Sequence, residues 1–406
     1  EPGLAEVLEK ARGRNLFFSD DIPGNIKNSE MIFMAVNTPT KTEGEGAGMA
    51  ADLSYIEACA RDIARYSKSD KIVIEKSTLP VRTAEKVKEI LSENSENIHF
   101  EILSNPEFLA EGTAIQDLLN PDRILIGGEK QEAIDSLSDI YSNWVSKNKI
   151  LETNIWSSEL SKLTANAFLA QRISSINSIS ALCEATGADV REVARAIGSD
   201  NRIGSKFLDS GPGFGGSCFK KDILNLIYLS NYFGLYEVAN YWQSVIQLNN
   251  WQKKRICEII IEKLFGTLSG KTIAVLGFAF KANTNDTRES PSIEICRNLL
   301  NEGAFLSIHD CKVSKETIDK DLSNNDKSLI NNISWAYHED LYSALEGAHA
   351  AVLLTEWDVY KTLDWEKIVH HVNKPFWVFD TRSILNPKEM NSLGINFWQL
   401  GYGNNN

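Results

Sequence analysis

The sequence contains few cysteines and histidines for its length, and their positions exclude several kinds of site. Its six cysteines (Cys59, Cys183, Cys218, Cys257, Cys296 and Cys311) form no C-x-x-C pair in 406 residues. This pattern argues against a disulfide framework and against a zinc site. All six histidines lie outside residues 100–308. We therefore expect reduced thiols, predict no metal site, and expect lysine and carboxylate side chains to transfer protons.

Positive charge and long apolar runs are also scarce. The 42 basic residues face 55 acidic ones, which gives a net charge of −13, and the lysines and arginines are scattered. This balance argues against nucleic acid and anionic membranes as general partners. No stretch approaches the ~20 apolar residues that a membrane helix needs, and the opening Glu-Pro-Gly is unlike a signal peptide. We expect a soluble, cytoplasmic protein.

A third absence concerns the glycine-rich turn of dinucleotide-binding sheets. Such a sheet opens with a strand followed by G-x-G-x-x-G, and no such element precedes Met31. The loop Gly-Pro-Gly-Phe-Gly-Gly at 211–216 matches the pattern literally, but no strand leads into it. The sequence therefore predicts a first domain that lacks its opening strand, phosphate-binding turn, first helix and second strand.

Strand and helix patterns alternate in two parts of the chain. Apolar runs predict strands at 31–36, 71–74, 100–103 and 123–126, with helices over 52–66 and after Pro80, and a second series of strands at 272–277, 304–310, 350–354 and 376–380. Short apolar strands with helical crossovers predict a parallel sheet in each part. The acidic, asparagine-rich stretch 319–332 is interpreted as a surface excursion and residues 404–406 as a frayed end.

The middle of the chain is predicted to be helical. One long helix covers 157–187, a short one begins after Asp189 and ends near Gly198, and further helix extends to about residue 264. The fold class is therefore α/β, with two Rossmann-like parallel-sheet domains joined by a long central helix and a helical region. The predicted domains are 1–153, 154–265 and 266–406, the first incomplete at its N-terminus.

Residues 211–222 combine a glycine-rich loop, one cysteine and several charges. The loop leads into Ser217 and Cys218, two lysines and Asp222 follow, and an apolar helical run then extends to Gly234. We expect Ser217 to be the N-cap and Cys218 to lie in the first turn. The helix dipole and the lysines favour a thiolate there. Cys218 is predicted to be a nucleophile; the alternative is a small buried apolar residue.

Polar residues follow three strands of the first part, at 37–40, 77–78 and 105–107. Ligands of open parallel sheets bind at the carboxyl ends of the strands. The first domain is therefore expected to bind its cofactor at these three strand exits.

Six segments, in this order, closely resemble the UDP-glucose/GDP-mannose dehydrogenase family, and within it the animal-type UDP-glucose 6-dehydrogenases. They are Val-Asn-Thr-Pro-Thr at 36–40, Glu-Lys-Ser-Thr at 75–78, Ser-Asn-Pro-Glu-Phe-Leu-Ala-Glu-Gly at 104–112, Ser-Lys-Leu-Thr-Ala-Asn-Ala-Phe at 161–168, Gly-Phe-Gly-Gly-Ser-Cys at 213–218 and Gly-Phe-Ala-Phe-Lys at 277–281. Any one of these segments is weak evidence for the family, but six segments in the family's order are specific evidence. The resemblance implies a homo-oligomer, at least a dimer and by default a hexamer.

The resemblance also implies an activity, the four-electron oxidation of UDP-glucose to UDP-glucuronate with two NAD⁺. The route passes through an aldehyde, a thiohemiacetal and a thioester on Cys218, followed by hydrolysis. Such a route explains why a cysteine is needed, because an aldehyde has no second hydride to give until a nucleophile adds to its carbonyl.

Five further residues receive catalytic roles from the resemblance. Lys162 and Asn166, at i and i+4 on the long helix, would polarise the C6 oxygen. Asp222 would act with Lys162 in proton transfer, Glu107 would activate the hydrolytic water, and Thr78 would position water or cofactor. Asn166 could instead be a helix-surface amide, and Thr78 could cap the next helix.

The binding residues are implied in the same way. Those for the cofactor are Val36, Asn37, Thr38, Pro39, Thr40, Ser77, Thr78, Glu111, Lys221 and Arg288. Those for the substrate are Glu107, Phe108, Leu109, Ala110, Glu111, Lys162, Asn166, Arg202, Phe207, Phe214, Gly215, Cys218, Phe219, Phe280, Lys281 and Arg382. Arg202 would reach the substrate of a neighbouring subunit, although each arginine could also be a salt-bridged loop residue. At the position of Asp209, animal-type enzymes tend to carry lysine. The resemblance therefore leaves open whether the side chain of residue 209 contacts the substrate.

Two alternatives remain open. A related nucleotide-sugar 6-dehydrogenase would act on GDP-mannose or a UDP-N-acetyl-sugar, because base and C2 contacts cannot be identified from one sequence. The second alternative is that the chain is a catalytically inactive interaction subunit or fragment, because the phosphate-binding turn is missing.

Overall fold

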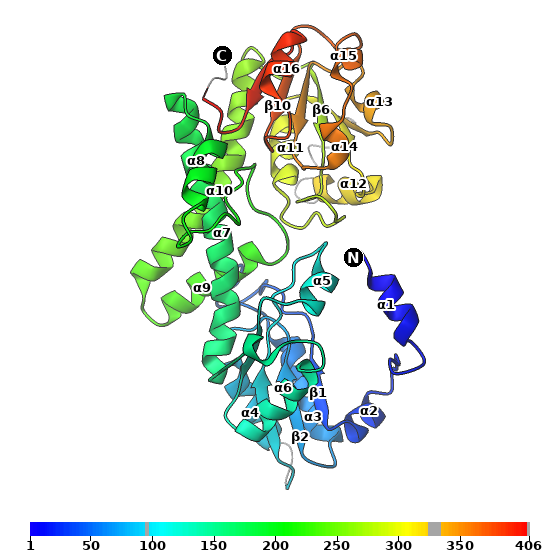
Figure 1. The fold of residues 1–406 in the computed structure, drawn as a ribbon, viewed down its shortest axis with the longest axis vertical. Helices are drawn as coiled ribbons and strands as arrows, with labels where there is room; N and C mark the ends of the chain where they lie inside the picture. Colours follow the sequence, from blue (N-terminus) through cyan, green and yellow to red (C-terminus); the bar gives the residue numbers. More distant parts are fainter. Residues whose placement is uncertain (94–96, 324–333, 404–406) are drawn as a thin grey trace. The chain divides into compact units, whose positions relative to one another are not determined.

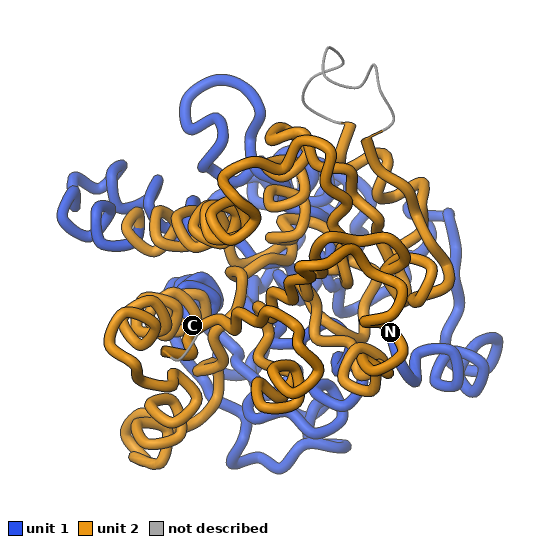
Figure 2. The backbone as a smooth tube through the Cα atoms, turned by 90° about the horizontal axis from the view of Figure 1, so that it is seen from above, with its two compact units in different colours: residues 1–167, 221–242 blue, residues 168–220, 243–406 orange. Residues whose placement is uncertain are grey.

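The computed structural model describes residues 1–93, 97–323 and 334–403, and the chain forms two compact units (Figures 1 and 2). Unit 1 comprises residues 1–167 and 221–242, and unit 2 comprises residues 168–220 and 243–406. The predicted surface excursion from residue 324 on and the predicted frayed end at 404–406 lie outside the described residues. Within the described part of the chain, no helix has both the length and the apolar character needed to cross a membrane.

Unit 1 contains a five-stranded sheet in the order β1-β2-β3-β4-β5. The strands are β1 Met31–Met34, β2 Lys71–Glu75, β3 Phe100–Ser104, β4 Ile124–Gly127 and β5 Ile150–Thr153. The four predicted strands are confirmed, whereas β5, a short and half-polar segment, was not predicted. Neighbouring strands run parallel except for β3 and β4, which are antiparallel and meet through a single residue pair. The expectation of a parallel sheet therefore fails at this one place.

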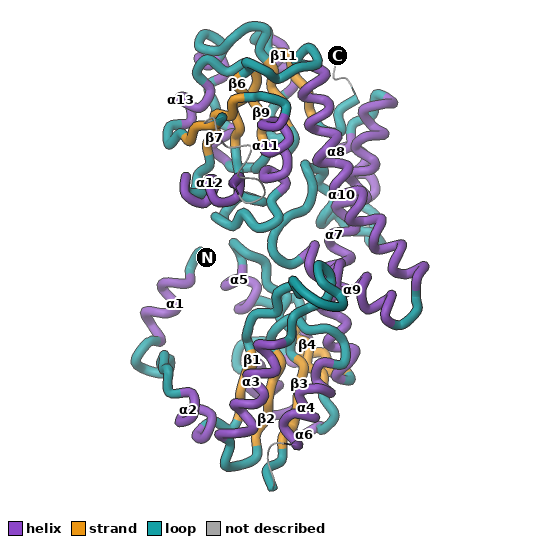
Figure 3. The backbone as a smooth tube through the Cα atoms, turned by 180° about the vertical axis from the view of Figure 1, so that it is seen from behind, coloured by secondary structure: helices purple, strands orange, loops and turns teal. Residues whose placement is uncertain are grey.

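Helices cover both faces of this sheet (Figure 3). The helices of unit 1 are α1 Leu4–Ala11, α2 Ile22–Asn28, α3 Ser54–Tyr66, α4 Thr83–Glu93, α5 Ala114–Leu119 and α6 Gln131–Tyr141, with a 3₁₀ turn at Lys147–Lys149. Of these, α3 and α4 cover one face of the sheet and α6 covers the other, whereas α1 and α5 contain no buried residue. Successive strand residues point to opposite faces. Accordingly Val73 and Ile102 pack in one cluster with α3 and α4, while Ile74 and Leu103 pack in another with α6. The continuous apolar strands of the sequence thus fill two cores.

Four helices form the middle of the chain: α7 Ile155–Thr186, α8 Val190–Gly198, α9 Phe219–Tyr232 and α10 Tyr236–Lys263. The predicted long helix is confirmed as α7, and Asp189 caps α8 by accepting a hydrogen bond from the Arg191 amide. Helix α9 begins at Phe219, so Cys218 directly precedes it and does not lie in the first turn as predicted. The Ser217 hydroxyl lies 3.5 Å from the Cys218 sulfur.

Unit 2 contains the second sheet, with strand order β11-β10-β9-β6-β7-β8 and every neighbouring pair parallel. The strands are β6 Thr272–Leu276, β7 Phe305–His309, β8 Trp335–Tyr337, β9 Ala350–Leu353, β10 Trp377–Asp380 and β11 Asn396–Gln399. The helices are α11 Pro291–Asn301, α12 Lys315–Ser323, α13 Leu341–Leu345, α14 Asp358–Lys361, α15 Trp365–Ile368 and α16 Pro387–Ser392. The four predicted strands are confirmed; β8 and β11 were not predicted.

Gly277 follows β6 at a close approach to the end of β9. Its φ is +99°, and a Cβ placed there would lie 2.4 Å from the Thr355 Cβ and 2.7 Å from the Thr355 nitrogen. We expect Gly277→Ala to lower the free energy of unfolding by about 3 kcal/mol or more, because backbone strain and overpacking add. Gly347→Ala is the matched control, since φ there is +66° in open space, and should cost only about 1 kcal/mol. Equal decreases in Tm, measured by calorimetry, would contradict the argument.

Candidate active site

The ends of β1 and β2 are tied together by hydroxyl groups. Ser77 Oγ donates a hydrogen bond of 2.6 Å to the Val36 carbonyl, and Thr38 Oγ1 donates one of 3.0 Å to the Thr78 carbonyl. Two predicted cofactor segments that are about forty residues apart in the sequence are thereby held side by side at the carboxyl edge of the sheet, where ligands of such folds bind.

An ion pair between a buried lysine and a partly exposed glutamate joins α7 to the loop that follows β3. Lys162 is 3% exposed, and its Nζ lies 3.1 Å from Glu107 Oε1. The other oxygen of Glu107 accepts a 2.6 Å hydrogen bond from the Leu109 amide. The ring of Phe108 lies 5.4 Å from the Lys162 ammonium and 3.8 Å from the Arg123 guanidinium. The predicted substrate loop therefore folds around Lys162.

One turn further along α7, Asn166 contacts the beginning of α9. Its Nδ2 donates a 2.6 Å hydrogen bond to Asp222 Oδ2, and Asp222 is 1% exposed. Lys221 Nζ lies 3.5 Å from the other carboxylate oxygen and 3.2 Å from both Thr38 oxygens. Asn166 is thus a buried, hydrogen-bonded amide, which is inconsistent with the alternative of a helix-surface residue.

The Asp222 carboxyl is suited to proton transfer. Burial raises its pKa, while the Lys221 ammonium, the Asn166 hydrogen bond and the Lys162 ammonium act in the opposite direction. A carboxyl with a raised pKa beside ammonium groups can accept and return a proton at lower energetic cost than an isolated carboxylate in water. The geometry of unit 1 therefore places this carboxyl beside the Asn166 amide and the Lys221 ammonium.

In unit 2, the glycine loop before α9 is held by side-chain amides. The Gly211 amide donates to Asn177 Oδ1 on α7 at 2.9 Å, and the Phe214 amide donates to Asn249 Oδ1 on α10 at 2.8 Å. A Cβ at Gly215 would lie 2.7 Å from a backbone carbonyl oxygen. The loop consequently needs glycine for close backbone packing, which agrees with our interpretation that it is not a dinucleotide fingerprint.

Cys218 is exposed at the end of this loop. An aromatic cluster adjoins it, because the Phe219 ring lies 6.5 Å from Phe207 and 6.1 Å from Phe214. All six cysteines are free, and Cys311 is the other exposed one. Burial raises the pKa of Cys257 to about 12. The alternative that Cys218 is a small buried apolar residue is wrong.

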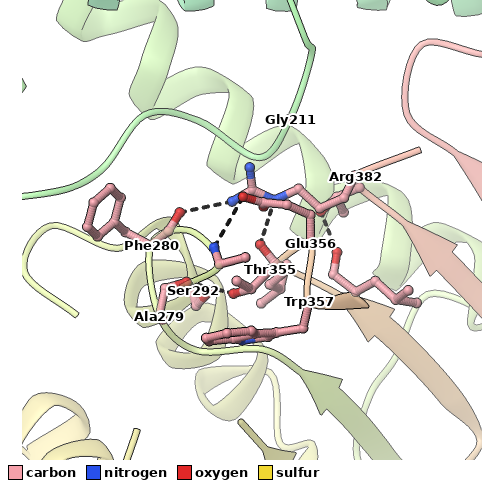
Figure 4. Close-up of polar contacts among 12 residues, drawn as sticks. Gly211, Ala279, Phe280, Ser292, Thr355, Glu356, Trp357 and Arg382 are labelled. Carbon is pink, nitrogen blue, oxygen red and sulfur yellow. Dashed lines mark hydrogen bonds and ion pairs between the residues drawn. The ribbon is translucent and has the colours of Figure 1, made fainter. Parts of the chain in front are cut away.

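Arg382 links three strand ends of the second sheet (Figure 4). Its Nε donates to the Leu354 carbonyl at 2.8 Å, and its guanidinium donates to the Phe280 carbonyl at 3.1 Å and pairs with Glu356 at 3.2 Å. Burial opposes ionisation of Glu356, but the Arg382 charge, two backbone hydrogen bonds and the Lys281 charge together outweigh it and lower the pKa of that carboxyl. Sequence reasoning missed Glu356, although the strand-end rule applied to β9 would have indicated it.

The other predicted cations of unit 2 lie nearer the surface. The Arg202 side chain is 89% exposed and pairs with Asp200 at 2.6 Å; Arg288 is 63% exposed and pairs with Asp286 at 2.7 Å. Both arginines form the loop salt bridge that the sequence offered as an alternative, and their binding roles stay predictions. Lys281 Nζ lies 5.5 Å from the Phe280 ring.

Three models of one family match the chain in succession. They are the NAD binding domain at residues 1–145, the central domain at 156–251 and the UDP binding domain at 274–387 of the UDP-glucose/GDP-mannose dehydrogenase family. The chain belongs to the UDP-glucose/GDP-mannose dehydrogenase family. The resemblance drawn from six segments is therefore confirmed, as is NAD as the cofactor.

Individual relatives agree with this assignment. The chain is 57% identical over 410 residues to the UDP-glucose 6-dehydrogenase of Gallus gallus, covering 99% of this chain and 83% of the relative. It is 53% identical over 416 residues to UDP-glucose 6-dehydrogenase 5 of Oryza sativa, covering 99% and 87%. Among solved structures, a UDP-glucose dehydrogenase from Pyrobaculum islandicum matches with a TM-score of 0.85 and 31% identity, covering 99% and 87%.

Within this family member, the predicted site residues are distributed over both units. Unit 1 contains Val36, Asn37, Thr38, Pro39, Thr40, Ser77, Thr78, Glu107, Phe108, Leu109, Ala110, Glu111, Lys162, Asn166, Lys221 and Asp222, and unit 2 contains Arg202, Phe207, Phe214, Gly215, Cys218, Phe219, Phe280, Lys281, Arg288 and Arg382. The hydroxyl and amide groups after β1 and β2, with one ammonium, are of the kind that bind ribose hydroxyls and carboxamides. The residues present therefore fit NAD.

Two buried carboxyls lie beneath this edge of the sheet. Glu75 ends β2 and Glu159 belongs to α7, and they are 1% and 2% exposed. Glu159 accepts hydrogen bonds from the Arg82 and Ala84 amides at the start of α4. Burial and the neighbouring Glu159 charge raise the pKa of Glu75 well above its ordinary range. The hydrogen-bonded Glu159 is therefore the ionised partner and Glu75 carries the proton.

This pair makes stability depend on pH. The folded state holds a proton that the unfolded state releases near the ordinary pKa of 4.5, so stability is fully present below that value and falls as pH rises toward the raised pKa. The maximal slope is about 1.4 kcal/mol per pH unit. Glu75→Gln should flatten the decline of Tm above about pH 5, whereas Glu132→Gln, at an exposed position, should not. Parallel profiles for wild type and Glu75→Gln would refute the assignment.

Proposed function

We propose that this chain catalyses the NAD-dependent four-electron oxidation of UDP-glucose to UDP-glucuronate. The relatives at 51–57% identity that carry this name support the substrate. The observation that carries the chemistry is the buried pair of contacts Lys162–Glu107 and Asn166–Asp222, since it supplies one ammonium and two carboxyls with distinct partners.

In the first oxidation, the C6 hydroxyl of the sugar loses its proton and a hydride to give an aldehyde. Bound NAD⁺ supplies the hydride acceptor in both oxidations. Lys162 stabilises the negative charge that develops on the C6 oxygen. The alcohol proton passes toward Asp222, whose raised pKa suits it to accept a proton.

In the second oxidation, the Cys218 thiolate adds to the aldehyde carbonyl and forms a C–S bond, and the oxygen takes up a proton to give a thiohemiacetal. Loss of that proton and of the second hydride yields a thioester. The exposure of Cys218 supports this role, because an added nucleophile must be accessible to the substrate.

Hydrolysis completes the reaction. Glu107 removes a proton from water, the resulting hydroxide attacks the thioester, and cleavage of the C–S bond returns the Cys218 thiolate and the carboxylic acid, which loses its proton to solvent to give the carboxylate product. The fixed orientation of Glu107, held by Lys162 on one oxygen and the Leu109 amide on the other, supports this assignment.

Cys218→Ser tests the covalent route. We expect steady-state formation of UDP-glucuronate to fall by roughly three orders of magnitude or more, because the acyl carrier is lost. Cys311→Ser is the matched control, since Cys311 is the other exposed cysteine, and it should keep wild-type turnover. Product formation by Cys218→Ser at an undiminished rate, measured by chromatography, would rule out the thioester.

Substrate competition tests the alternatives. UDP-glucose should have the highest kcat/KM in assays that also contain UDP-N-acetylmannosamine or GDP-mannose. A preference for either competitor would redirect the assignment within the family. Failure to bind NAD⁺ together with no turnover of any of the three would favour the inactive interaction subunit.

We further propose that the chain acts in the cytoplasm as a homo-oligomer, at least a dimer and by resemblance a hexamer. Tyr232, Tyr236 and Tyr241 at the junction of α9 and α10 are 68%, 61% and 53% exposed, and exposed aromatic groups favour association. Light scattering should give a mass of two or more 45.4 kDa chains. A monomer at assay concentration with full activity would contradict a site shared through Arg202.

A further inference from the structure

A second lysine lies beside the predicted active-site loop, and no role has been assigned to it above. Lys76 directly follows β2. Its Nζ donates hydrogen bonds of 3.0 Å to Asn105 Oδ1 and 3.1 Å to Tyr141 Oη, and it lies 5.6 Å from the centre of the Tyr141 ring. The ammonium is therefore held between the end of β3 and the end of α6.

The residue that Lys76 contacts is fixed from several directions. Asn105 is fully buried, its amide nitrogen donates to the Glu75 carbonyl at 2.9 Å, and its Nδ2 donates to the Leu125 carbonyl at 2.7 Å. Its Oδ1 accepts from Lys76 and, at 2.6 Å, from Tyr141. One side chain thus connects β2, β3, β4 and α6.

This arrangement occurs where the sheet itself is weakest. Strands β3 and β4 share only the pair Ser104 and Gly127, and they are antiparallel, so few ladder hydrogen bonds hold the end of β3 to its neighbour. The contacts of Asn105 replace that missing ladder. Lys76 supplies the charged hydrogen bond among them, and charge-assisted bonds are the stronger kind.

Fixing Asn105 also restricts Glu107, which lies two residues further along the chain. Pro106 stands between them, and its ring fixes one backbone dihedral, so little freedom separates a held Asn105 from the Glu107 carboxylate. The charges of Glu107 and Lys162 also act on Lys76. The orientation of Glu107 toward Lys162 therefore depends on how firmly Asn105 is held.

We propose that Lys76 is a positioning residue for Glu107, acting through Asn105 in the hydrolysis of the covalent intermediate. This inference rests on the proposed function, because it takes Glu107 as the base of that step. Lys76 is partly buried, and removing an ammonium from water costs free energy unless it is paired, so a residue that merely filled this space would be apolar. The two hydrogen bonds and the nearby carboxylate offset that cost.

The charged groups around Lys76 set its dependence on pH. Burial lowers the pKa of Lys76 to about 8. The Glu107 charge raises this pKa, and the Lys162 charge lowers it further. Burial raises the pKa of Tyr141 to about 12, so Tyr141 remains a neutral donor. Lys76 loses its charge as the pH rises through about 8, and the hydrolytic step should slow over the same range.

The test follows the acyl enzyme by rapid mixing with UDP-glucose and NAD⁺, acid quench and intact mass. Lys76→Met should keep both hydride transfers, seen as a burst of NADH, and should lower kcat roughly tenfold or more. The adduct on Cys218 should accumulate in this variant. Its rate of deacylation should no longer fall above pH 8. Lys71→Met is the matched control. Lys71 is a buried lysine at the beginning of β2, where it contacts Ser69 and a backbone carbonyl, and its variant should show no accumulation.

Two further variants keep the outcomes distinct. Tyr141→Phe removes the other donor to Asn105 and should give the same accumulation to a smaller extent, even if Lys76→Met fails to fold. Glu107→Gln reports the proposed base directly. If the adduct accumulates in Glu107→Gln but not in Lys76→Met or Tyr141→Phe, the inference about Lys76 is wrong while the proposed function stands. No adduct in Glu107→Gln and no product from wild type would overturn the proposed function instead. A Lys76→Met enzyme that loses the NADH burst would show a general structural role and refute the inference.

Discussion

Much of the polar architecture of unit 1 depends on the burial of the Lys162 ammonium. A buried charge is costly unless an opposite charge and hydrogen bonds compensate it. The loop after β3 supplies Glu107, and the beginning of α9 supplies Asp222, whose pKa the Lys162 charge lowers against burial. Glu107 and Asp222, which are each more than fifty residues away from Lys162 in the sequence, are thereby held near α7. The same charges that stabilise this arrangement are those that a hydride transfer from an alcohol requires.

In unit 2, several polar groups from distant segments likewise contact one cation, Arg382. This guanidinium contacts the carbonyls of Leu354 and Phe280 and the carboxylate of Glu356, so the ends of three parallel strands converge on a single cation. Parallel sheets leave polar strand ends along one edge, and a planar group with several donors can satisfy several of them at once. In each unit, one cation organises the edge of the sheet where ligands of this fold class bind; Lys162 is buried, and the Arg382 side chain is 15% exposed.

The glycine loop before α9 shows how a sequence pattern can be interpreted in two ways. Its spacing matches a phosphate-binding turn, but its backbone amides are engaged by Asn177 and Asn249, and its lack of side chains permits close packing against the loop after β6. The loop therefore holds the segment that ends in an exposed Cys218. Because the same residue spacing serves both purposes, the absence of a preceding strand was the deciding observation.

The sequence by itself determined the elements with long or strongly apolar patterns. Helix α7 with its terminal glycine and the eight predicted strands follow from periodicity, and the six family segments indicated most of the residues that line the strand ends. Strands β5 and β11 are four residues long and half polar, and β8 is only three residues long, so their patterns do not differ from those of loops. Strand direction has no signature in residue spacing, and the antiparallel β3–β4 pair could therefore not be predicted.

Only the tertiary structure decided which polar groups meet. Lys76 lies 29 residues from Asn105 and 65 residues from Tyr141 in the sequence, and neither distance produces a local pattern. The same holds for Glu356 with Arg382 and for Glu75 with Glu159. Local sequence encodes secondary structure because neighbouring residues share one backbone geometry. The partners of a buried charge are chosen by the packing of distant elements, since desolvation is compensated by whichever groups the fold brings within reach.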